Sequence, residues 1–168
     1  YTPSLAEVEV PKSLRGLLRA RADRLPNELL GALRHAAVLA PTFSLELFVA
    51  VSGSDVAEAE ASLDELRRAG FIERNGRDSY GFVNDMLRDV VYDGITFADR
   101  RRIHHRVALE MEFMYSDRLE EVYERLAAHY RESGQRDKAI DYLEKAGKKL
   151  QAENAHNAAF WHFLRAVE

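Results

Sequence analysis

The residues of this sequence whose types could bind a metal or transfer a proton are 6 histidines and 28 acidic residues. No two histidines have the His-Glu-x-x-His spacing that presents two imidazoles on one helix face. His104 and His105 are neighbours, so a helix would point them to different sides. The others in the C-terminal part are His129, His156 and His162. No nucleophile–histidine–acid set can be singled out, so we expect no catalytic residue and no metal site.

A second group that could do chemistry is a run of arginines in one predicted helix. Its members are Arg100, Arg101, Arg102 and Arg106. The favoured interpretation is a solvated helix face that pairs with Asp99, Glu110 and other neighbouring acids. The alternatives are that these arginines bind a polyanion or dock against an acidic surface of another domain, so they are candidate interaction residues.

Composition limits the class of protein that these residues can serve. The chain has 168 residues, of which 46% are hydrophobic and 31% charged, and its net charge is −4. This is typical of a globular protein and does not favour a basic nucleic-acid module. There is no cysteine, and the longest apolar run is too short to span a bilayer. We therefore expect a cytoplasmic protein without membrane contact, and we expect both ends to be internal to a longer polypeptide.

Apolar periodicity predicts helices through most of the first seventy residues. Residues 1–12 contain two prolines and read as an extended linker. The predicted helices that follow cover residues 13–25, 26–40, 44–51 and 55–69. Pro41 ends the second helix, Gly53-Ser54-Asp55 caps the fourth at its start, and Gly70 stops it.

The pattern then changes to that of a β-hairpin. Two short β-type runs, 71–74 and 79–83, flank Asn75-Gly76, which is a strong turn signal. Helices followed by a two-stranded hairpin are in the order of a winged helix, in which the hairpin is the wing. The sequence therefore predicts a mainly α fold whose first domain, residues 13–97, is a winged helix of three helices and a two-stranded β-hairpin.

The remainder is predicted to be helical. Residues 98–117 form a connecting helix, and residues 118–168 form tetratricopeptide-like hairpins from helices at 118–133, 135–152 and 154–168. Small and large residues there match the spacing of such a repeat: Leu126, Ala127, Tyr130, Gly134, Ala139, Leu143 and Ala146. Aromatic residues in these helices default to inter-helix packing, but repeat helices also present a concave binding face. Tyr123, Tyr130 and Trp161 are accordingly candidate interaction residues.

Several longer stretches support a family resemblance. They are 10–26, 35–39, 63–72, 80–92 and 101–108, and they include Leu63-Asp64-Glu65-Leu66-Arg67-Arg68-Ala69-Gly70-Phe71-Ile72. In this order they resemble the segment after the ATPase core in bacterial signal-transduction ATPases of the STAND class, such as multidomain adenylate cyclases and large transcriptional regulators. The resemblance implies that the winged helix packs on an upstream ATPase domain of the same chain, which would bind ATP or ADP. It also implies that the repeats sense a protein partner whose identity the sequence does not give.

The chain itself lacks a Gly-x4-Gly-Lys-Ser/Thr loop, so we expect no cofactor in this segment. It also departs from the family at one position. Relatives commonly carry a basic residue and a histidine after the second wing strand, near the phosphates, where this sequence has Val83-Asn84. Two interpretations of Asn84 remain open. Its amide could donate to a phosphate as a nucleotide-sensing position, or its side chain could cap the helix that follows.

The predicted function is that of a non-catalytic regulatory segment, which couples partner sensing by the repeats to an upstream nucleotide-binding domain. The first alternative is a protein-interaction scaffold with no nucleotide role. The second is a DNA-binding winged helix. Against DNA binding, the predicted recognition helix carries Asp55, Glu58, Glu60, Asp64 and Glu65, which phosphates would repel.

Overall fold

The computed structural model describes residues 12–76 and 78–167, with side-chain surroundings for 14–76 and 78–152. The described chain is mainly helical and contains a small antiparallel sheet of three strands. It divides into two compact units, residues 1–99 and 100–168. Within the described residues, no helix has both the length and the apolar character needed to cross a bilayer.

The described residues of the N-terminal unit form five α-helices. They are α1 (Lys12–Asp23), α2 (Asn27–Leu39), α3 (Leu45–Ser52), α4 (Val56–Arg68) and α5 (Asp85–Asp93). Their ends follow the local chemistry of the sequence. Ser44 caps α3 by accepting a hydrogen bond from the Leu47 amide at 3.2 Å, and Asp55 caps α4 by accepting one from the Glu58 amide at 2.8 Å. Gly53 ends α3 with a φ of 75°, which glycine adopts without strain.

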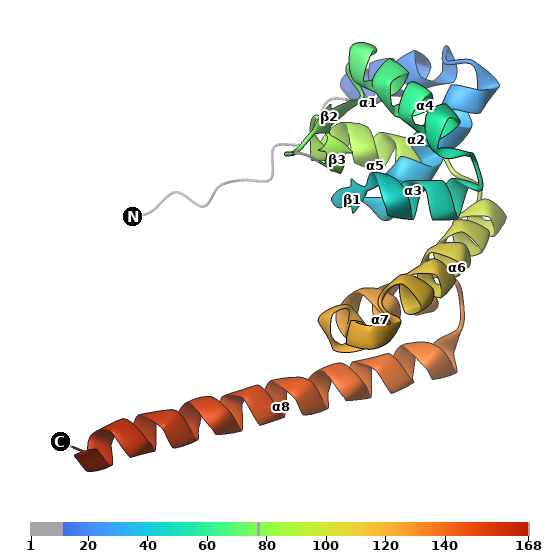
Figure 1. Cartoon of the computed structure of the whole chain (residues 1–168). Helices are drawn as coiled ribbons and strands as arrows, with labels where there is room; N and C mark the ends of the chain where they lie inside the picture. Colours follow the sequence, from blue (N-terminus) through green and yellow to red (C-terminus); the bar gives the residue numbers. More distant parts are fainter. Residues whose placement is uncertain (1–11, 77, 168) are drawn as a thin grey trace. The chain divides into compact units, whose positions relative to one another are not determined.

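The sheet has the strands β1 (Thr42–Ser44), β2 (Ile72–Arg74) and β3 (Ser79–Phe82), with β3 in the centre (Figure 1). The predicted hairpin is therefore present as β2 and β3. The expectation of only two strands is wrong, because β1 pairs with β3 through Phe43 and Tyr80. Gly81 suits the central strand, since a Cβ there would lie 3.0 Å from the Pro41 carbonyl oxygen.

The core of this unit lies between α2, α3, α4, α5 and the sheet. Its fully buried side chains come from all of these elements: Leu33, Phe48, Leu63, Leu66, Phe71, Ile72 and Leu87. The ring of Phe43 stacks on Phe48 at 5.8 Å and on Tyr80 at 6.0 Å, which joins β1 to α3 and to β3.

The turn after α4 is fixed by an arginine from α1. Gly70 has a φ of 68°, and the Arg21 guanidinium donates to the carbonyl oxygen of Ala69 beside it. The same guanidinium lies 4.6 Å from the centre of the Phe71 ring, in a cation–π contact. The positive charge of Arg21 therefore sits at the negative end of α4.

The C-terminal unit is built from all but the first turn of α6 (Phe97–Met114), the short 3-10 helix η1 (Ser116–Glu121), α7 (Tyr123–Glu132) and α8 (Arg136–Val167). The helix predicted at 118–133 is thus divided, and the backbone is non-helical at Arg118. Apolar side chains from all three α-helices meet in the core: Ile103, Val107, Met111, Leu126, Ala127, Tyr130, Ala139, Tyr142 and Ala146.

The two helices predicted at 135–152 and 154–168 form a single helix of 32 residues, so the predicted break near Asn154 is wrong. The segment around Asn154 has neither glycine nor proline to end a helix. Asparagine costs less than 1 kcal/mol inside a helix, which its neighbours can tolerate. Figure 1 shows α8 continuing well past α7, its partner in the hairpin.

Candidate interaction sites

Asn84 stands directly before α5 and caps that helix. Its backbone is extended, with φ −161° and ψ 155°, and its Oδ1 accepts a hydrogen bond from the Leu87 amide at 2.8 Å. The capping interpretation of Asn84 is therefore confirmed as a structural role. The side chain is also exposed, so the nucleotide-sensing role stays a prediction.

The four candidate arginines of α6 differ in their surroundings. Arg106 pairs with Glu110 one turn later, with Nε 2.7 Å from Oε1, as expected for a solvated helix face. Arg101 reaches α7 instead, where its Nε donates to the carbonyl oxygen of Ser133 at 3.0 Å. Arg102 is exposed and Arg100 is half-buried.

The Arg101 contact fixes the turn between α7 and α8. Gly134 in this turn has a φ of 81°, and a Cβ there would lie 2.9 Å from Cζ of Arg101. The cation therefore stabilises the carboxyl end of α7, as Arg21 does for α4. Arg101 is thus occupied with an internal role, which the sequence pattern did not predict.

The candidate aromatic residues lie mostly inside the helical bundle. Tyr130 is fully buried, and its ring stacks parallel to that of Tyr142 at 5.8 Å. Tyr123 is half-buried, with its ring 5.8 Å from Tyr142. Packing is therefore the role of Tyr130, which a partner cannot reach directly. Trp161 lies outside the residues whose side chains the structure describes, as do His156 and His162.

Glu112 on α6 is the centre of a polar network that joins three helices. Its carboxylate accepts a hydrogen bond from Tyr142 at 2.6 Å and is 3.2 Å from Nζ of Lys138. Lys138 also donates to the Tyr130 hydroxyl at 2.9 Å. Burial alone would raise the pKa of Glu112, but the hydrogen bonds from Tyr142, Tyr130 and Lys138 outweigh it and lower that pKa.

The same network acts on the two tyrosines. Burial is the main cause that raises the pKa of Tyr130 and of Tyr142 above the ordinary value, and the Glu112 carboxylate adds to it. Both hydroxyls therefore stay protonated at neutral pH and can donate hydrogen bonds. This arrangement stabilises the bundle, and it presents no group free to attack a substrate.

Two histidines far apart in the sequence meet between α6 and α7. Nδ1 of His104 lies 2.9 Å from Nδ1 of His129, and His104 is buried. Burial is the main cause that lowers the pKa of His129 to about 3, and the charges of His104 and Arg125 lower it further. Among the residues with described side chains, no group of three or more histidines, cysteines or acids could hold a metal.

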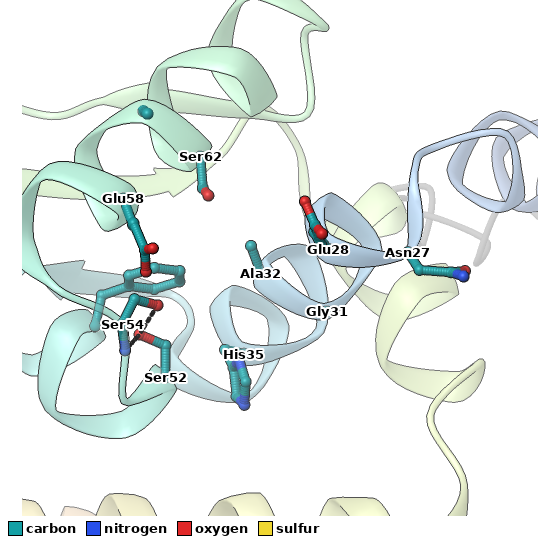
Figure 2. Close-up of a pocket in the computed structure, with 11 residues that line it drawn as sticks. Asn27, Glu28, Gly31, Ala32, His35, Ser52, Ser54, Glu58 and Ser62 are labelled. Carbon is teal, nitrogen blue, oxygen red and sulfur yellow. Dashed lines mark hydrogen bonds between the residues drawn. The ribbon is translucent and has the colours of Figure 1, made fainter.

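The largest described pocket lies between α2, α3 and α4 and has a volume of about 620 Å³ (Figure 2). Glu28 and Ala32 point from α2 towards the wall formed by α4 (Figure 2). Its lining is polar and small, and of its described residues none is lysine or arginine: Asn27, Glu28, Gly31, Ala32, His35, Phe48, Ser52, Ser54, Glu58, Ala61 and Ser62. The pocket could accept hydrogen bonds or a cation, but its residues do not form a catalytic set.

The surface of α4 is acidic, as the sequence predicted. Asp55, Glu58, Glu60 and Glu65 are all exposed. Asp64 is half-buried and pairs with Arg67, with a distance of 3.2 Å between Oδ1 and NH2. This helix would therefore present mainly negative charge to a partner.

Comparison of the chain with protein-family models, with curated proteins and with solved structures found no match.

Proposed function

We propose that this chain is a non-catalytic regulatory and protein-interaction segment of a larger bacterial, cytoplasmic signal-transduction ATPase. In this proposal the N-terminal unit is a winged helix that packs on an upstream nucleotide-binding domain. The C-terminal unit is a tetratricopeptide-like module that senses a protein partner. A rigid-body movement of the winged helix, biased by nucleotide and by the partner, would connect the two events.

The element order of the N-terminal unit supports the winged helix. α3 and α4 are joined by the short turn Gly53–Asp55, as in a helix-turn-helix pair, and the hairpin of β2 and β3 follows α4 directly. β1 adds a third strand to this hairpin before α3 begins. The hairpin then leads into α5 through the Asn84 cap.

The acidic surface of α4 is the single observation that favours a protein partner for this unit. A winged helix that reads DNA places basic or amide side chains from this helix against the duplex. Here Glu58, Glu60 and Glu65 are exposed and would be repelled by phosphates. The charge of α4 suits a basic protein surface instead.

Packing in the C-terminal unit supports the tetratricopeptide-like module. α7 and α8 form a hairpin closed at Gly134, and small buried residues lie where the two helices approach: Ala127, Ala139 and Ala146. The large rings of Tyr130 and Tyr142 fill the space beside them. This alternation of small and large residues is the packing on which such repeats depend.

The nucleotide role is tested at Asn84 in the full-length protein. Asn84→Ala removes both the side-chain amide and the helix cap, whereas Asn84→Ser keeps a capping oxygen and removes only the amide. If Asn84 senses nucleotide, both variants will release ADP faster than the parent protein. If only Asn84→Ala changes ADP release, the effect comes from loss of the cap. Unchanged release in both favours the second candidate, a scaffold without a nucleotide role.

The class itself is tested on the 168-residue chain. We expect no ATP hydrolysis and no cyclase activity, and measurable turnover of either kind would overturn the proposal. We also expect no salt-sensitive binding in a mobility-shift assay with duplex DNA at low salt. The matched control is a charge-reversed α4 carrying Glu58→Lys and Glu65→Lys, which should gain DNA affinity if charge is what prevents binding.

A further inference from the structure

The pocket between α2, α3 and α4 is formed by the same spacing of residues on two helices. Each helix carries a glutamate, then two small residues one turn later, then a polar residue one turn further on. On α2 these are Glu28, Gly31, Ala32 and His35, and on α4 they are Glu58, Ala61, Ser62 and Glu65. Positions three and four residues apart lie on one helix face, and all of these but Glu65 line the pocket. Each helix therefore places a carboxylate beside a stretch with little side-chain volume.

The small residues give this pocket its depth. A Cβ built on Gly31 would have no atom of another side chain or element within 4 Å. Ala32 is half-buried and Ala61 is exposed, and their methyl groups leave the space between the helices open. The resulting volume of about 620 Å³ is large enough to hold side chains of a short peptide segment.

The polar groups around this space are mainly hydrogen-bond acceptors. Figure 2 shows Glu28 and Glu58 on either side of Ala32. The ionised carboxylates can only accept hydrogen bonds. The Ser54 hydroxyl donates its hydrogen to Oγ of Ser52 at 2.9 Å, so it offers the pocket only its lone pairs. A ligand rich in N–H donors would therefore suit this lining.

The charge of this lining is negative. Its ionisable residues are Glu28, Glu58 and His35, so their sum is negative whether or not His35 is protonated. On α4, Arg67 lies on the opposite side from Glu58 and forms an ion pair within its own helix. Glu65 is exposed and continues the acidic row outside the pocket. The pocket would therefore attract a cation and repel an anion.

Arginine is the protein side chain that best fits these acceptors. Its guanidinium has five N–H donors and no acceptor, and it can bind a carboxylate through two parallel hydrogen bonds. Lysine supplies three donors from a more strongly hydrated point charge, which is harder to bring out of bulk water. The aliphatic stem of an arginine can also lie along the methyl groups of Ala32 and Ala61.

We propose that the pocket between α2, α3 and α4 binds a basic segment of a partner protein, whose arginine side chains are held by the carboxylates of Glu28 and Glu58. The proposal rests on the function proposed above, because it names where the protein partner of the N-terminal unit would bind. The competing explanation is a general attraction of cations to the acidic surface of α4, and the test distinguishes the two.

The first test is a titration of the 168-residue chain with the peptide acetyl-Gly-Arg-Gly-Arg-Gly-amide, followed by the amide resonances in two-dimensional NMR spectra. We expect saturable shifts at Gly31, Ala32 and Ala61, with a dissociation constant in the millimolar range, as for a few hydrogen-bonded ion pairs. The control peptide carries citrulline in place of arginine, which keeps the shape of the side chain and removes its charge. It should bind at least about threefold more weakly.

The second test separates the pocket from the surface of α4. Glu28→Gln and Glu58→Gln should each weaken arginine-peptide binding about threefold or more. The matched control is Glu60→Gln, which removes the same charge from an exposed position on the opposite side of α4 from Glu58 and should leave binding unchanged.

A further variant fills the pocket without changing its charge. Ala61→Leu should weaken arginine-peptide binding about tenfold or more because the larger side chain occupies the space. Its control is Ala57→Leu, at an exposed position of α4 outside the pocket lining. Thermal denaturation checks that each variant remains folded.

Three results would each overturn the proposal. They are the absence of shifts with the arginine peptide, equal binding of the citrulline peptide, and equal effects of Glu60→Gln and Glu58→Gln. Full binding by Ala61→Leu would likewise place the peptide outside the pocket. The function proposed above fails separately, because ATP hydrolysis by the chain or its binding to DNA would overturn that function whether or not this pocket binds arginine.

Discussion

Nδ1 of His104 and Nδ1 of His129 face each other at 2.9 Å between α6 and α7. One ring must donate its hydrogen and the other must accept it, so this hydrogen bond survives only while at least one Nδ1 carries no proton. Protonating both rings would bring two N–H groups together in a buried place. The contact between α6 and α7 is therefore sensitive to acid.

The first prediction concerns the stability of the C-terminal unit at low pH. The pKa of His129 is about 3 in the folded chain, against an ordinary value of 6.5. Between these values the unfolded chain binds a proton that the folded chain does not. The contribution of His129 to the free energy of unfolding is therefore full above pH 6.5. It falls as the pH drops towards 3, by roughly 3–5 kcal/mol in total. Urea denaturation at a series of pH values measures this slope.

The control for this prediction is a pair of histidine variants. His129→Gln keeps a side chain that can hydrogen bond to His104 but does not titrate, so its stability should depend less on pH across this range. His35→Gln changes a half-buried histidine of the other unit and should leave the slope of the C-terminal unit unchanged. If stability depended on pH equally in His129→Gln and in the parent chain, the assignment of this dependence to His129 would be wrong.

The second prediction concerns the turn between α7 and α8. Gly134→Ala should destabilise the chain by about 2 kcal/mol or more, because the alanine is strained at a φ of 81° and its Cβ displaces Arg101. Gly53→Ala has a similar φ of 75° but open space around it, so it should cost only about 1 kcal/mol. Thermal denaturation measures the loss of stability in both variants. In an Arg101→Ala background the cost of Gly134→Ala should shrink to that of Gly53→Ala, and an undiminished cost would count against the contact.

The third prediction concerns Glu112. Glu112→Gln keeps the shape of the side chain but removes the charge that Tyr142 and Lys138 contact, so it should destabilise the chain by about 1–2 kcal/mol. Glu110→Gln, on the same helix, breaks only the pair with Arg106 and should cost about 0.5 kcal/mol or less. Because the pKa of Glu112 is lowered on folding, its contribution is present above pH 4.5 and is lost as the pH falls below that value. Denaturation of Glu112→Gln and of Glu110→Gln, at neutral and again at acidic pH, distinguishes the two effects on stability.

The fourth prediction separates the two roles of Asn84 by stability alone. Asn84→Ala removes the acceptor of the Leu87 amide and should destabilise the N-terminal unit by about 1 kcal/mol. Asn84→Ser offers another capping oxygen and should stay within about 0.5 kcal/mol of the parent chain. Thermal denaturation of the two variants gives the comparison. If both were equally destabilised, the amide itself would be needed for stability.

Local signals in the sequence predicted much of the fold. Asp55 before the apolar period of α4 and Asn75-Gly76 between two β-type runs both act through neighbouring residues, and both predictions agree with the structure. β1 was missed because its three residues are stabilised by pairing with β3, almost forty positions away. A strand of this length has no periodicity of its own to recognise.

The candidate sites were harder to predict, for the same reason. His104 and His129 are separated by 25 positions, and Glu112 is 30 positions from Tyr142. Only the packing of α6 against the hairpin of α7 and α8 brings them together. The pairing of Arg106 with Glu110, by contrast, depends on one helical turn and was expected from the spacing alone. Helix ends and local pairs are thus readable in the sequence, whereas contacts between helices depend on the packed chain.

Arg21 and Arg101 have a consequence for how the ends of α4 and α7 exchange their amide hydrogens with solvent. Helix ends ordinarily fray, so their amides exchange quickly and independently of the rest of the protein. Here the carbonyls of Ala69 and Ser133 are each held by a guanidinium from a distant helix. Slow deuterium uptake at Gly70 and Gly134 would therefore report whether α1 and α6 remain docked.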